Sequence, residues 1–72
     1  MNLNYKVAGK LKKIRIDNKF SQAEVSKLLF VSQSKISRLE NGETKITMDD
    51  LQNYCRICNV DIKRFLNECF SK

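Results

Sequence analysis

The chain has 72 residues and a net charge of +6, with 14 lysines and arginines against 8 acids, which suits one small domain, residues 1–72, with a modest core. Apolar residues spread along the whole chain argue against disorder, and the lack of an apolar run in "MNLNYKVAGK" argues against a signal peptide or a membrane span. Three cysteines imply no disulfide framework, so we expect a cytoplasmic protein in a reducing environment.

The positive charge is unevenly placed along the chain. Residues 1–20 hold six bases and one acid, residues 21–45 hold four bases and three acids, and residues 46–72 hold four of each. A basic N-terminal segment indicates a polyanionic partner or an anionic membrane surface, unless it is a solvated, lysine-rich helix that aids solubility. Membrane binding is disfavoured, because the core needs the apolar face of the first helix.

Helix caps punctuate the sequence and no alternating strand pattern is found, so we expect an all-α fold of five short helices. The first helix spans roughly Asn4 to Asn18. Ser21 and Glu24 then form a capping box that opens a second helix, Gln22–Leu29. Apolar residues recur at helical spacing on these two helices: Val7, Leu11, Ile14, Val25, Leu28 and Leu29.

The stretch "SQSKISRLENG" predicts a third helix, Gln33–Asn41, with Ser32 as its N-cap and Gly42 as its stop. The first turn of this helix contains Ser34 and Lys35 but no acid. A carboxylate there would stabilise the helix by about 0.3–1 kcal/mol through the helix dipole, so its absence suggests that this end faces something other than water.

Two more helices follow. Thr47 and Asp50 form a second capping box that opens the fourth helix, which Asn59 can end in a left-handed conformation. Asp61 caps the fifth helix. The apolar residues expected to point inward from these helices are Leu51, Tyr54, Cys55, Cys58, Ile62, Phe65 and Leu66.

About three residues join the second and third helices, which is the spacing of a helix-turn-helix motif. In that motif the second helix enters the DNA major groove, and its N-terminal residues face the base edges. Neutral hydrogen-bonding side chains and a basic side chain suit this position, whereas carboxylates would be repelled by the DNA phosphates. The unusual first turn of the third helix is thereby explained.

The stretch "RIDNKFSQAEVSKLLFVSQSKISRLENGETKIT" resembles the small helix-turn-helix domains of phage repressors and Cro proteins, the XRE-like family. The likeness rests on the Ser-Gln-Ala-Glu start, the Val-Ser turn, the Ile-Ser-Arg-Leu-Glu-Asn-Gly end and the following Leu51–Val60 helix, and it runs from about Val7 to Phe65. It implies a compact five-helix, lambda-repressor-like DNA-binding domain that regulates transcription, as a repressor or a Cro/C1-type switch.

The resemblance also implies a role for each position of the motif. Base edges are expected to be read by Gln33, Ser34, Ser37 and Arg38, since Gln suits adenine and Arg suits guanine. Contacts to the DNA backbone are expected from Gln22, Arg15, Lys35, Asn41, Thr44 and Lys45. Arg15 and Glu40 also occupy positions that form an ion pair in some relatives. The alternative for Gln33, Ser34 and Arg38 is an ordinary solvated helix face.

Two positions depart from the pattern of the family. Relatives often have glycine where this chain has Lys19 and Phe30, and a bulky residue at positive φ is strained. We expect Asn18 to take the left-handed conformation in the first case. For Phe30 no local alternative offers itself, so the turn is expected to be rebuilt, unless Phe30 contacts another subunit.

No catalytic, metal or cofactor site is expected. The chain has no histidine and no pairing of a nucleophile with a base, and a structural zinc site wants four Cys or His ligands. Cys55 and Cys58 fall on the apolar face of the fourth helix and are expected to be core thiols. Cys69, near the end of the chain, is expected to be exposed.

The sequence therefore predicts a transcriptional regulator that binds double-stranded DNA as a homodimer, at a two-fold symmetric operator, with no small-molecule ligand and no membrane partner. The loop after the third helix and residues Phe65 to Phe70 are the candidates for the dimer contact. The alternative is a protein-interaction module on the same fold, such as a partner of a toxin or a polymerase.

Overall fold

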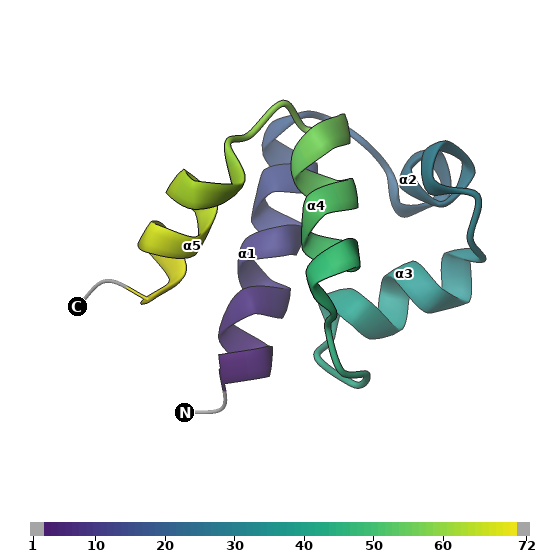
Figure 1. Ribbon diagram of the computed structural model, residues 1–72. Helices are drawn as coiled ribbons and strands as arrows, with labels where there is room; N and C mark the ends of the chain where they lie inside the picture. Colours follow the sequence, from purple (N-terminus) through teal and green to yellow (C-terminus); the bar gives the residue numbers. More distant parts are fainter. Residues whose placement is uncertain (1–2, 71–72) are drawn as a thin grey trace.

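The computed structural model describes residues 3–70 of the chain (Figure 1). It contains five helices, α1 (Leu3–Asp17), α2 (Gln22–Leu29), α3 (Gln33–Glu40), α4 (Met48–Ile57) and α5 (Ile62–Phe70), and no strand within this range. The expected all-α fold is confirmed. Asn18 and Asn41, predicted to end their helices, lie just beyond the last residues of α1 and α3.

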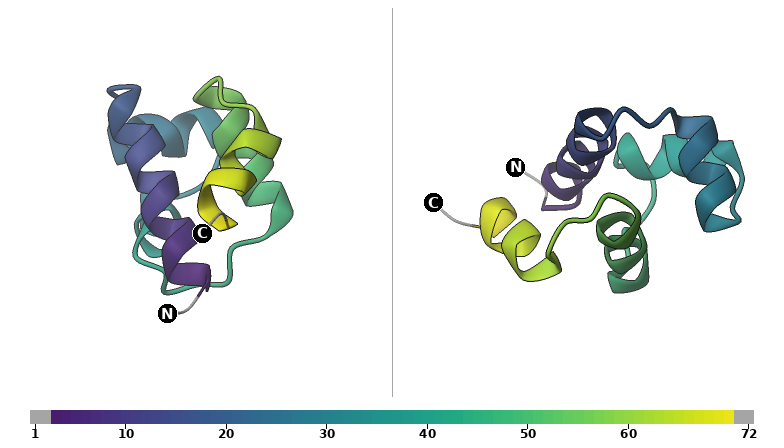
Figure 2. Two further views of the ribbon diagram at one scale, coloured as in Figure 1. Left: turned by 90° about the vertical axis from the view of Figure 1, so that its left-hand side faces the viewer. Right: turned by 90° about the horizontal axis from the view of Figure 1, so that it is seen from above.

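The helices are arranged around a central pair. Figure 1 shows α1 and α4 side by side, with α5 on one flank and α2 and α3 on the other, and the view from above in Figure 2 agrees. The fifth helix contacts both α1 and α4, while α2 packs on α3, and α3 in turn contacts α1. Within residues 3–70, no helix has the length and apolarity needed to cross a bilayer.

Each helix contributes apolar side chains to one core. The fully or nearly fully buried ones are Val7, Leu11, Ile14, Val25, Ile36, Leu39, Leu51, Tyr54, Cys55, Cys58, Phe65 and Cys69. Leu28 is 46% exposed, although it shares the helical spacing of α2. Cys69 is buried, so its predicted exposure is wrong: α5 runs to Phe70, and Cys69 lies one turn after Phe65 on the same face.

Both predicted capping boxes are confirmed. The Ser21 hydroxyl accepts a hydrogen bond from the Glu24 amide at 3.0 Å, and the Glu24 carboxylate accepts one from the Ser21 amide at 2.8 Å. Thr47 and Asp50 make the same reciprocal pair, at 3.0 and 3.1 Å. These local bonds satisfy amide groups that would otherwise lack partners at the start of α2 and α4.

The first four helices end in left-handed residues, with φ near +60° for Lys19, Phe30 and Asn59 and +72° for Gly42. Beyond each helix, two backbone hydrogen bonds close a Schellman motif, such as Phe30 N to Lys27 O and Val31 N to Ser26 O. Two expectations are therefore wrong. Lys19, rather than Asn18, takes the left-handed conformation, and the turn at Phe30 is kept instead of rebuilt.

The structure shows how these two side chains are tolerated. The backbone amide of Asn18 donates to the Ile14 carbonyl at 3.2 Å, which continues the hydrogen bonding of α1, and its side-chain amide donates to the same carbonyl at 2.7 Å. The reversal therefore falls on Lys19. The side chain of Phe30 is 95% exposed, which leaves its ring free of clashes with the helix. The cost of the conformation is borne by the backbone alone, at about 1–2 kcal/mol for a residue with a Cβ.

Candidate nucleic-acid interface

The third helix separates a buried face from a polar one. Ile36, Leu39 and Glu40 are buried against the rest of the protein. The side chains predicted to read bases lie on the other side, where Gln33, Ser34 and Arg38 are exposed and Ser37 is half-buried. The structure thus brings the four predicted base-reading residues to one face of α3, which Figure 1 shows standing out from the central helices.

Two of these side chains are already in contact. Arg38 Nη2 donates a hydrogen bond to Ser34 Oγ, at 3.2 Å, across one turn of α3. This bond directs the guanidinium along the helix toward its N-terminus. The N-terminus is capped by Ser32, whose hydroxyl accepts from the Lys35 amide at 3.1 Å, and the first turn contains no acid.

A groove of about 460 Å³ runs between α3 and the loop that leads into α4. It is lined by Ser32, Lys35, Arg38, Leu39, Thr44, Lys45, Thr47 and Asp50. Three cations of the helix and the loop meet here, whereas the carboxylate of Asp50 is engaged by the amide of Thr47. The groove therefore joins the predicted base-reading helix to predicted backbone contacts in one positively charged strip.

The loop itself carries the predicted phosphate contacts Asn41, Thr44 and Lys45. Asn41 and Lys45 are exposed and Thr44 is half-buried. Asn41 Nδ2 donates to the Glu43 carboxylate at 3.0 Å. Helix α3 ends two residues before the left-handed Gly42, so the loop turns back alongside the groove rather than continuing the helix axis.

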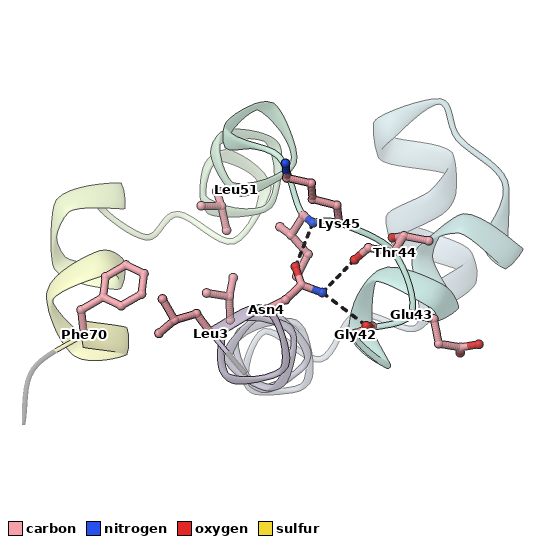
Figure 3. A pocket seen from close by; sticks show the side chains of 10 residues that line it. Leu3, Asn4, Gly42, Glu43, Thr44, Lys45, Leu51 and Phe70 are labelled. Atoms are coloured by element: carbon pink, nitrogen blue, oxygen red, sulfur yellow. Dashed lines mark hydrogen bonds between the residues drawn. The ribbon is translucent and has the colours of Figure 1, made fainter. Parts of the chain in front are cut away.

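Sequence reasoning missed the residue that holds this loop. The side-chain amide of Asn4, on the first turn of α1, donates to the carbonyls of Gly42 and Thr44 at 3.3 and 2.9 Å, and its oxygen accepts from the Ile46 amide at 3.0 Å (Figure 3). These partners lie 38–42 residues away in sequence, so no local pattern could have revealed them.

Arg15 and Glu40 form the ion pair that the resemblance implied. Arg15 Nε and Nη2 donate to the two carboxylate oxygens of Glu40 at 2.7 and 2.9 Å, and Nη1 donates to the Phe20 carbonyl at 2.8 Å. Both side chains are buried. The hydrogen bond to Glu40 also raises the pKa of Arg15, so this guanidinium stays charged.

Glu40 has two further partners. Tyr54 donates its hydroxyl to Glu40 at 2.9 Å, and Gln22, half-buried at the start of α2, donates its amide at 3.3 Å. Burial, and then the nearby Glu40 carboxylate, raise the pKa of Tyr54 well above its usual range. One buried carboxylate thus joins α1, α2, α3 and α4, a role of Tyr54 that its place on the apolar face of α4 did not suggest.

The three cysteines are unpaired and buried, as predicted for Cys55 and Cys58. Burial raises the pKa of each thiol, to about 11 for Cys58. Within residues 3–70, no three Cys, Asp or Glu side chains are placed to hold a metal ion together.

Comparisons with known proteins agree with this geometry. A profile of the helix-turn-helix family matches residues 11–65. Two crystal structures of the clp gene regulator ClgR from Corynebacterium glutamicum superpose with a TM-score of 0.87 at 22% sequence identity, covering 96% of this chain and 90% or 73% of the ClgR chains. Curated proteins give no match. The chain belongs to the helix-turn-helix family of DNA-binding transcriptional regulators, of the Cro/C1 type.

Proposed function

We propose that this protein is a sequence-specific regulator that binds a two-fold symmetric DNA operator as a homodimer. The observation that carries this proposal is the exposed face of α3, which combines Gln33, Ser34 and Arg38 with a first turn free of acids. A helix end with this composition suits the negatively charged major groove, because its amides, hydroxyls and guanidinium can all donate to base edges.

Gln33, Ser34, Ser37 and Arg38 read the bases in this proposal. Their common face on α3 supports this role, and the hydrogen bond that Arg38 donates to Ser34 Oγ pre-orients its guanidinium for the two acceptors of a guanine.

Gln22, Lys35, Asn41, Thr44 and Lys45 hold the DNA backbone. The positive charge of the groove beside α3 supports the roles of Lys35, Thr44 and Lys45. Gln22 is the first residue of α2, at the positive end of that helix dipole, which supports its role. Arg15, also expected to contact the backbone, is buried against Glu40. We therefore assign it to orienting α3 rather than to touching a phosphate.

A homodimer is proposed because one small module covers only about 600–1,000 Å² of DNA, too little for binding that is both tight and specific. Two copies with a net charge of +6 repel each other, so they should meet where charge is balanced. A mainly apolar groove of about 510 Å³ meets this need, with Leu3 and Phe70, both at least half exposed, at its edges. Phe65, another candidate for the contact, is fully buried.

A protein-interaction role on the same fold is the second candidate. It is favoured by Phe30 and Leu28, two exposed apolar side chains at the end of α2. Single exposed apolar residues are common on protein surfaces, so this observation weighs less than the composition of α3.

The test is a binding selection from a random pool of duplex DNA, at near-physiological salt and with excess non-specific competitor. Recovery of a two-fold symmetric motif with half-sites about one DNA turn apart is expected. If binding is weak, recovers no motif and decreases steeply as the salt concentration rises, the protein only attracts DNA phosphates non-specifically. That result would favour the protein-interaction role.

A further inference from the structure

The side chain of Asn4 is the most extensively bonded polar group outside the residues assigned above. It lies half-buried on the first turn of α1 and makes three hydrogen bonds to the backbone of the loop between α3 and α4. Figure 3 shows the amide of Asn4 between the two chain segments, with its oxygen and its nitrogen both turned toward the loop.

The three bonds fall on both sides of one proposed phosphate contact. Asn4 Nδ2 binds the Thr44 carbonyl at 2.9 Å and Asn4 Oδ1 binds the Ile46 amide at 3.0 Å, so the residue held between them is Lys45. The segment from Glu43 to Ile46 is neither helix nor strand. Because no helical or strand hydrogen bonds fix the backbone of this segment, its conformation depends on side-chain bonds such as those from Asn4.

A second contact presses the same loop onto α1. A Cβ atom placed on Gly42 would come within 2.7 Å of Cδ1 of the Tyr5 ring, so the ring lies directly against the backbone of Gly42. Gly42 also has φ of +72°, which other residues adopt at a cost. Adjacent residues of α1, Asn4 and Tyr5, thus fasten the loop from its start to its end.

We infer that Asn4 is a positioning residue for DNA binding, which holds the loop in the conformation that presents Thr44 and Lys45 to the phosphate backbone. This inference rests on the proposed function. A loop that is fixed before binding loses less conformational freedom on contact with DNA, so the fastening increases affinity without touching the nucleic acid. Only an asparagine-like amide fits, since the loop offers carbonyls and an amide to one side chain.

The fastening can first be tested without DNA, by amide hydrogen exchange of Ile46. In Asn4→Ala the Ile46 amide loses its acceptor and should exchange at least about tenfold faster than in the wild type. Asn53→Ala, which removes a half-buried asparagine from α4, is the matched control and should leave this amide unchanged. Equal protection of Ile46 in the wild type and in Asn4→Ala would overturn the inference at once.

The second test measures binding to the selected operator and to an unrelated duplex. Asn4→Ala should weaken both by the same factor, about 3- to 10-fold, because phosphate contacts carry no sequence information. Lys45→Ala should cost less affinity in the Asn4→Ala background than in the wild type, since the two residues act together. A general loss of stability would not produce this coupling when each variant is shown to be folded at the assay temperature.

The outcomes separate the inference from the proposed function. If the wild type binds no duplex, both fall. If the wild type binds and Asn4→Ala binds equally well, or if the effects of Asn4→Ala and Lys45→Ala simply add, only the positioning role falls. Should Asn4→Ala not fold, Asn4→Asp keeps the acceptor for Ile46 and replaces the Nδ2 donor by a carboxylate oxygen that faces the carbonyls of Gly42 and Thr44. This variant must then show the same loss of affinity for both duplexes.

Discussion

The guanidinium of Arg15 and the carboxylate of Glu40 meet in two parallel hydrogen bonds, 2.7 and 2.9 Å long, that join α1 to α3. Glu40 is 5% exposed and Arg15 8%, so water does not screen the pair. This ion pair therefore ties α3, which carries the proposed base-reading face, to α1. The family resemblance predicted that the two residues pair, and the structure adds the hydrogen bonds that each of them makes to other partners.

Breaking this pair should destabilise the protein severely. Glu40→Leu leaves a buried guanidinium without its partner, which costs about 3–5 kcal/mol, against a total stability of roughly 4–11 kcal/mol for a domain of this size. Urea unfolding followed by circular dichroism should show a midpoint far below that of the wild type, or no folded baseline.

The control removes the three buried polar side chains of the network together and leaves only the half-buried amide of Gln22 and the carbonyl of Phe20 without these partners. Combining Arg15→Met and Glu40→Leu with Tyr54→Phe replaces the network by apolar side chains of similar size and should restore most of the lost stability. A triple variant as unstable as Glu40→Leu alone would show that shape, rather than the unpaired charge, dominates the loss.

Phe30→Gly should stabilise the fold. The left-handed conformation costs a residue with a Cβ about 1–2 kcal/mol, and the exposed ring of Phe30 gives up no core contacts when it is removed. Glycine also gives the unfolded chain more conformational freedom, which offsets about 0.4–1 kcal/mol of this gain. The net gain should be up to about 1.5 kcal/mol, seen as a rise in Tm of several degrees.

Phe30→Ala is the matched control, because alanine removes the ring but keeps the Cβ. It should leave Tm near the wild-type value. If Phe30→Gly melts no higher than Phe30→Ala, the backbone at this turn is unstrained and the cost assigned to it is wrong.

Stability should fall in mildly alkaline solution. Burial raises the pKa of Cys58 from 9.0 to about 11 and also raises those of Cys55, Cys69 and Tyr54. Above pH 9 the unfolded chain loses thiol protons that the folded chain keeps, so the free energy of unfolding decreases as pH rises. Cys58 alone should contribute a loss on the order of 2 kcal/mol by pH 11, with little change between pH 6 and 8.

Urea unfolding at pH 7, 9 and 10 under reducing conditions measures this loss. Cys58→Ala should be less stable at pH 7 because of the cavity, yet lose less between pH 7 and 10 than the wild type does. An identical pH profile for the two proteins would mean that the Cys58 thiol ionises as easily in the folded state as in the unfolded one.

Much of the fold could be predicted because its signals are local. A capping box joins residues three apart, and the buried faces of α1 and α3 recur every three or four residues, so Ser21, Thr47, Leu11 and Ile36 were placed correctly. The same spacing predicts the buried faces of α2 and α5 less well. Leu28 fits the spacing in α2 but is exposed, and Cys69 was not included in the apolar face of α5 but is buried.

The parts that could not be predicted depend on distant partners. Asn4 binds a loop about forty residues away, and Tyr54 donates to a carboxylate on another helix. Neither the type nor the sequence position of Asn4 and Tyr54 indicates these hydrogen bonds. The prediction for Phe30 was wrong for a different reason. The left-handed backbone is tolerated because the ring is exposed, and the residue type alone does not indicate that a phenylalanine in a turn is exposed.

Phe70→Glu should weaken self-association without unfolding the protein. Phe70 is 50% exposed beside the apolar groove proposed as the dimer contact, and burying a phenylalanine side chain contributes about 1.5–3 kcal/mol. Analytical ultracentrifugation over a range of concentrations should show at least a tenfold weaker dimer. Phe30→Glu, a change of the same kind at an exposed residue away from the groove, is the control; an equal loss in both would place the contact elsewhere.

The last prediction separates the bases read by α3 from the phosphates held around it. Gln33→Ala and Arg38→Ala should each cost about 1–3 kcal/mol on the selected operator and relax base preference at one position, with little effect on an unrelated duplex. Lys45→Ala should weaken both duplexes alike and reduce the slope of log K against log salt by about one, since one phosphate contact is lost. Titrations of both duplexes at several salt concentrations measure all three variants together. Equal losses on both duplexes for Gln33→Ala and Arg38→Ala would remove these residues from base reading and leave α3 a backbone-binding helix.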